Sequence, residues 1–180
     1  MKYLVFLLIV CLSFFSNIIF ADETGFNEKK VDINLDCGDE KNGIFIGIKK
    51  FEDKLLGLEK INKNKNSTYG LPVSIVIKED HPQGHVYTSF QVFRFASQKT
   101  FLLRSSVLIG DQIRLRETYW KANEKKISDY EKIKKQADRE PNLKKFVKIL
   151  EVYTFEVIKY FKEIKSEKPH MGRVISCHKY

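Results

Sequence analysis

The chain is poor in the residues around which catalytic motifs are usually built. It has 3 cysteines, 9 glycines and 4 histidines among 180 residues. No Cys-x-x-Cys pair is present, which argues against a redox-active dithiol. The glycines are scattered, so no phosphate-cradling loop is recognisable, and the Gly-x-Ser elbow of hydrolases is missing. We therefore predict no catalytic residues and no cofactor, and the sequence favours a binding role over an enzymatic one.

The longest apolar run lies at the N-terminus. Lys2 gives a positive start, Tyr3 to Phe20 is apolar apart from a few Ser and Asn residues, and Ala21 precedes the polar Asp22. This pattern predicts a secretory signal peptide, residues 1–21, cleaved after Ala21. A retained membrane anchor is the alternative, since the run reaches about 18 residues, but its polar interruptions argue against it. We therefore expect a secreted or periplasmic protein with no transmembrane segment after cleavage; the sequence leaves a bacterial or a eukaryotic host open.

Two cysteines, Cys37 and Cys177, remain after this cleavage. In an oxidising compartment two remaining cysteines most simply form a disulfide bond. This bond would join the first and last predicted strands.

Residues 22–180 are predicted to form a single α+β domain. Strand patterns occur near 31–37 and 44–48, and four more follow between Leu71 and Trp120, with a short last strand at 173–177. The apolar spacing in 51–61 indicates a helix, as do a Lys- and Glu-rich segment at 120–137 and a strongly amphipathic one at 143–164. We expect an antiparallel sheet of about four to seven strands with the long last helix on one face. A small closed barrel with a C-terminal helix is the competing architecture.

The turn at Gly110-Asp111 suggests a two-residue hairpin. In that register Arg104 lies opposite Glu117, an oppositely charged pair on an otherwise apolar face. We interpret it as a structural cross-strand pair. The alternative is that Arg104, Glu117 and Tyr119 orient a ligand in a cavity.

The chain is basic, with a net charge of +9, of which +8 lies after residue 21. The segment 114–148 holds twelve Lys or Arg residues and six Asp or Glu residues, so it supplies +6. This distribution predicts a surface for an anionic partner, such as an anionic macromolecule, a membrane surface or a host protein. The candidate residues of this basic surface are Arg114, Arg116, Lys121, Lys125, Lys126, Lys134 and Lys135.

Two other hypotheses remain open. The protein could carry a small apolar ligand between sheet and helix, or it could be a metal-dependent enzyme. Asp80, His81 and His85 are weak metal candidates, because Pro82 and Gly84 place them in a loop rather than on one helical face. Asn66 begins a formal glycosylation sequon, which is meaningful only in a eukaryotic host.

Overall fold

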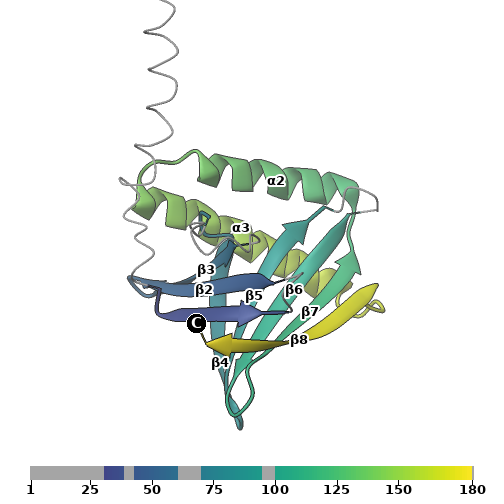
Figure 1. Cartoon of the computed structure of the whole chain (residues 1–180). Coiled ribbons are helices and arrows are strands. Elements are labelled where there is room, and N and C mark those ends of the chain that lie inside the picture. Colours follow the sequence, from purple (N-terminus) through teal and green to yellow (C-terminus); the bar gives the residue numbers. More distant parts are fainter. Residues whose placement is uncertain (1–30, 39–42, 61–69, 95–99, 180) are drawn as a thin grey trace, which may run out of the picture.

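The computed structural model describes residues 31–38, 43–60, 70–94 and 100–179, which form a closed barrel of eight antiparallel strands with two helices outside it (Figure 1). The strands are β1 (Ile33–Cys37), β2 (Ile44–Phe51), β3 (Lys54–Lys60), β4 (Ser74–His81), β5 (Gly84–Phe93), β6 (Phe101–Ile109), β7 (Arg114–Lys121) and β8 (Met171–Lys179). The helices are α2 (Glu124–Asp138) and α3 (Leu143–Ile164).

The predicted open α+β sheet is therefore wrong. Each strand pairs with its neighbour in the sequence, and β1 also pairs with β8, so the sheet has no edge. Closure satisfies the backbone groups that two edge strands would otherwise expose. Alternating apolar residues are equally compatible with an open sheet and with a barrel, which is why the pattern alone favoured the wrong architecture.

The seam between β1 and β8 carries the disulfide. Cys37 and Cys177 are directly opposed in the register and form the bond, with their Cα atoms 4.1 Å apart. The predicted pairing of the two cysteines, and its place between the first and last strands, are confirmed.

The segment 51–61 is not a helix in its described part. Residues 54–60 form β3, whose inward positions include Gly57. A Cβ atom at Gly57 would lie 3.0 Å from a methyl carbon of Val76 on β4, so the missing side chain leaves room for Val76.

The β6–β7 hairpin differs from the predicted register by one residue. Arg104 lies opposite Thr118, and Ser105 lies opposite Glu117. The turn therefore spans more residues than Gly110-Asp111, since the last opposed pair is Leu108 and Arg114. A slip of one residue exchanges the two faces of a strand, so Arg104 and Glu117 are on opposite sides of the barrel wall.

The register divides every strand into inward and outward positions, because opposed residues share a face. The part of the interior around the disulfide is apolar. Its buried side chains are Leu35, Ile48, Val76, Tyr87, Val107 and Leu115.

An asparagine caps the N-terminus of each helix. Asn123 accepts hydrogen bonds from the backbone N–H groups of Lys125 and Lys126, and Asn142 accepts one from Lys145. The helices lie side by side over the outer wall of the barrel (Figure 1).

Helix α3 is attached to the outer wall by apolar and polar contacts. Phe161 packs against Phe90 and Trp120, with ring centroids 5.1 and 5.0 Å apart. The Tyr153 hydroxyl accepts a hydrogen bond from the N–H of Val92 at 2.9 Å. Burial raises the pKa of Tyr153 to about 12, so its hydroxyl stays protonated.

The predicted signal peptide and the sequon at Asn66 lie outside the described residues. Within the described part of the chain, neither helix combines the length and the apolar character needed to cross a membrane. The disulfide fits an extracellular or periplasmic protein.

Candidate functional site

The residues of the predicted basic surface fall on two separate parts of the molecule. Lys125, Lys126, Lys134 and Lys135 belong to α2, whereas Arg114 and Arg116 project outward from β7, which ends at Lys121. The structure therefore does not bring them together into one patch.

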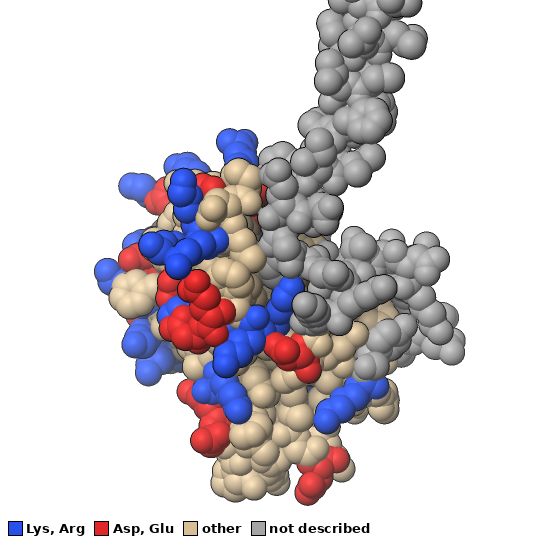
Figure 2. All heavy atoms as spheres, turned by 90° about the vertical axis from the view of Figure 1, so that its left-hand side faces the viewer, with Lys and Arg blue, Asp and Glu red and all other residues tan. Residues whose placement is uncertain are grey.

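The α2 lysines are largely balanced by acids. The helix contains five lysines and four acidic residues, a net charge of only +1. Lys134 pairs with Asp138, and Lys132 pairs with Asp129 at 3.2 Å. Figure 2 shows basic and acidic side chains interspersed on one face of the molecule.

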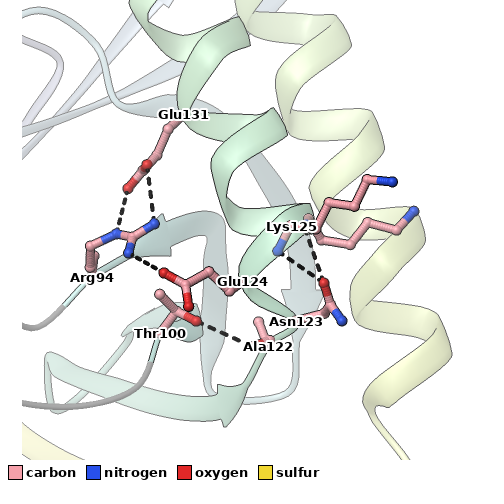
Figure 3. A network of polar contacts seen from close by, with 8 residues as sticks. Arg94, Thr100, Ala122, Asn123, Glu124, Lys125 and Glu131 are labelled. Carbon is pink, nitrogen blue, oxygen red and sulfur yellow. Dashed lines mark hydrogen bonds and ion pairs between the residues drawn. The ribbon is translucent and has the colours of Figure 1, made fainter.

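Two acids of α2 also hold the helix to the barrel (Figure 3). Arg94, after the end of β5, reaches Glu124 at 2.8 Å and Glu131 at 3.2 Å. The Thr100 hydroxyl donates a hydrogen bond to the carbonyl of Ala122, just before the helix. Glu124 and Glu131 therefore have a structural role, because they hold α2 to the end of the barrel.

The β7 arginines belong to a different environment, which we call the arginine groove. This groove lies on the outward face of β5 to β8, reaches the end of β4 at His81, and has a volume of about 420 Å³. Its lining residues are His81, Gln83, Val86, Arg104, Ser106, Leu108, Arg114, Arg116 and Val174. A neighbouring hollow of about 310 Å³ shares Gln83, Leu108 and Arg114 with it.

The sheet register explains why three arginines meet here. Arg114 and Arg116 are two residues apart on β7 and share its outward face, about 7 Å apart along the strand. Arg104 of β6 is diagonal to Arg116, because Arg116 lies opposite Ser106. Ser106 is small, which leaves space between the guanidinium groups.

The groove is cationic because no acid balances its arginines. Its described lining includes no Asp or Glu, and no ion pair of Arg104, Arg114 or Arg116 is found among the described residues. Arg114 donates a hydrogen bond to the side chain of Gln112. The nearest outward acid on the β4 side, Glu79, lies beyond Val86, and Asp111 lines only the neighbouring hollow.

Arg104 is the most constrained of the three arginines. Its guanidinium lies 5.8 Å above the ring of Phe90, which opposes it on β5. Its Nε is buried and has no hydrogen-bond acceptor among the described residues. Such a donor costs about 1–3 kcal/mol when it stays unpaired, so an acceptor in the groove would be favourable.

Glu117 and Tyr119, which were grouped with Arg104 as ligand-orienting residues, face the barrel interior instead. Tyr119 donates a hydrogen bond to the buried Glu117 at 3.2 Å, and the exposed Arg173 of β8 forms an ion pair with the same carboxylate. Burial, assisted by the negative charge of Glu117, raises the pKa of Tyr119 to about 12. These residues form a satisfied internal network rather than a unit with Arg104.

A second carboxylate, Glu59 of β3, also faces the interior. Gln91 donates a hydrogen bond to it at 2.6 Å. Burial raises its pKa, the bond from Gln91 opposes the rise, and the charge of Glu117 adds to it.

The interior offers little room for a ligand. The hollow beside Glu59 and Gln91 has a volume of only about 20 Å³, which suits one water molecule. The interface of α3 with the wall, where a carried apolar ligand was expected, is filled by packed side chains such as Leu56, Leu102 and Leu150.

The weak metal candidates lie at the β4–β5 hairpin. His85 contacts Asp80 at 3.0 Å, while Nδ1 of His81 accepts a hydrogen bond from the N–H of Gln83. No group of three His, Cys, Asp or Glu residues placed to hold a metal ion occurs in the described part of the chain.

Comparisons with protein-family models, with curated proteins and with solved structures find no match for this chain. Functional inference therefore depends on the geometry of the groove and on its charges.

Arg114 and Arg116 were predicted from the sequence, whereas Arg104 was assigned to the wrong partner. Arg173, Glu59 and Gln91 were not predicted, because their roles depend on strand pairings between distant parts of the chain. The sequence held only a weak signal for these residues, because each is a charged or amide residue at an inward position of an otherwise apolar strand.

Proposed function

We propose that this is a secreted, non-enzymatic binding protein that takes an anionic partner at the arginine groove. The observation that carries the proposal is the meeting of three arginines in one groove whose described lining contains no acid. Guanidinium groups suit this role, because they stay charged and bind carboxylate, phosphate or sulfate in a bidentate manner. The expected cleavage after Ala21 and a single domain in residues 22–180 are part of the same proposal, and the disulfide supports export.

The groove is a better candidate than α2, although both contain residues of the predicted basic surface. Lysines on α2 alternate with acids, so their field is largely cancelled at the surface. Arg104, Arg114 and Arg116 add their charges without an acid in the described lining, and the half-buried Arg104 is screened less than an exposed charge.

A charge-reversal experiment separates the two surfaces. The variants are R114E/R116E in the groove and K125E/K126E on α2, which change the net charge by the same amount. Binding to heparin, used as a generic polyanion, is measured between low and physiological salt. We expect the groove variant to lose roughly tenfold or more in affinity and the helix variant to change little.

Both pairs are exposed, so both variants should fold, and circular dichroism and thermal unfolding check this. If the helix variant lost binding while the groove variant kept it, the site would be wrong. Equal losses would indicate a response to net charge alone and would also contradict the proposed site.

A further inference from the structure

The arginine groove combines its cationic side chains with an apolar floor. Across the strands, Val86 lies opposite Leu108, and Leu108 lies opposite Arg114. Ser106 lies opposite Arg116, and Arg116 lies opposite Val174, which is 58% exposed. In each of these two rows of the wall, an arginine therefore lies directly beside an apolar side chain.

We infer that the groove binds an amphiphilic anion: a single apolar chain that ends in an oxyanion such as a phosphate monoester or a carboxylate. This inference rests on the proposed function and specifies the ligand. The oxyanion binds Arg104 and the diagonal Arg116, and the chain lies on Val86, Leu108 and Val174.

The dimensions of the groove favour a small ligand over a polymer. Its volume of about 420 Å³ is within the roughly 300–1,000 Å³ of small-molecule sites, and the adjoining hollow extends it past Leu108. A single-stranded nucleic acid would need aromatic side chains for base stacking, and the described lining has no Phe, Tyr or Trp.

Arg104 is the best candidate for contact with the headgroup. It lies where α3 begins to cover the wall, since its neighbour Phe90 packs against Phe161 of that helix. The ring of Phe90 holds the guanidinium in place, and the buried Nε still lacks an acceptor among the described residues. An oxyanion in the groove would supply one, in a partly desolvated place where charge-assisted hydrogen bonds are strong.

The chain of the ligand would then extend away from α3, toward Leu108 and the turns at the far end of the barrel. This direction follows from the rows of the sheet: Arg104 comes first, Arg116 and Val174 next, and Leu108 with Arg114 last. A chain of several methylene groups on this floor should raise the affinity by roughly tenfold or more over the bare headgroup.

The test uses calorimetric titration of the oxidised protein with three probes: dodecyl phosphate below its micellar concentration, inorganic phosphate, and an uncharged dodecyl glycoside. We expect dodecyl phosphate to bind at least tenfold more tightly than either of the others. R104M should weaken dodecyl phosphate roughly tenfold, and L108N, which removes the apolar contact without adding a charge, should weaken it without lowering the affinity for inorganic phosphate. K125Q is the matched control for R104M and should leave all three affinities unchanged.

The alternative outcomes are distinguishable. Equal affinity for inorganic and dodecyl phosphate would overturn the amphiphile while leaving anion binding in place. Equal affinity for dodecyl phosphate and the glycoside would show that the arginines do not contribute to binding. The proposed function would then be wrong as well. Binding to vesicles of phosphatidylglycerol and phosphatidylcholine, without binding of monomeric dodecyl phosphate, would overturn the inference in favour of a membrane surface.

If no probe bound, the inference would be wrong, and the heparin experiment would decide the proposed function separately. Should R104M fail to fold, R116Q provides the same comparison from an exposed position.

Discussion

Glu59 and Glu117 place two carboxylates inside one barrel, but their surroundings differ. Glu117 pairs with Arg173, whereas the described partner of Glu59 is the neutral amide of Gln91. A neutral donor compensates a buried charge less well than a guanidinium does. Ionisation of Glu59 therefore works against folding.

This imbalance predicts a pH-dependent effect of E59Q. The pKa of Glu59 is raised from its ordinary 4.5 on folding, so its favourable contribution is complete below about pH 4.5 and is lost as the pH rises through the folded pKa. Glutamine cannot ionise and can still accept the hydrogen bond from Gln91. The stability of E59Q relative to the wild type should therefore increase from pH 4.5 to pH 8 in urea unfolding. A difference that stays constant over this range would contradict the raised pKa.

Single residues also mark the limit of prediction from the sequence. Arg114 and Arg116 were recognised because charge can be counted, and their outward position follows from the β7 pattern. Arg104 was assigned to Glu117 because the turn was taken as two residues long, and the actual turn shifts the register by one. Turn length is decided by local backbone geometry, which the dipeptide Gly110-Asp111 does not determine.

At the scale of elements, both later helices were predicted, but the one expected at 120–137 starts at Glu124, because residues 120 and 121 complete β7. The bounds of α3 match the predicted 143–164, since its apolar stripe is long and Asn142 caps it. The segment 51–61 has apolar residues at helical spacing, yet residues 54–60 form β3. Its short run is ambiguous, and pairing with β2 and β4 decides it.

The cap of α2 provides a prediction at this scale. The Asn123 side chain accepts hydrogen bonds from two backbone N–H groups of the first turn, at 3.0 and 3.4 Å. N123A should lower the free energy of unfolding by about 1 kcal/mol, within a range of roughly 0.5–2 kcal/mol. N123D is the control and should keep most of the stability, because aspartate caps equally well. Urea unfolding followed by the fluorescence of the buried Trp120 measures both; equal losses in the two variants would contradict the role of the cap.

At the scale of the whole molecule, the order of the strands could be predicted from the sequence, whereas the closure of the sheet into a barrel could not. Seven of the eight strands were anticipated near their observed positions, and β3 was the exception. Whether the first and last strands meet depends on the accumulated tilt and stagger of all the others, which no local pattern records. The two cysteines were the one long-range signal.

The disulfide predicts a large effect on stability, because it closes a loop with a sequence separation of 140 residues. In the chain-entropy model its loss costs roughly 5 kcal/mol, and measured values for such bonds are about 2–5 kcal/mol. We expect C37S/C177S to unfold at a clearly lower guanidinium concentration than the oxidised wild type. The wild type treated with a reducing agent should match the variant. An unchanged midpoint would show that the seam is held by its hydrogen bonds and packing alone.

The seam between β1 and β8 also determines when the barrel can complete its folding during synthesis. Hairpins such as β4–β5 and β5–β6 can form as soon as their residues are available, but β1 must wait for a partner that is synthesised some 140 residues later. Until β8 arrives, β1 and β7 both present unpaired edges, to which other unfinished chains could add their own strands. Translation that stopped before residue 171, where β8 begins, would therefore release an aggregation-prone fragment rather than a shorter folded protein.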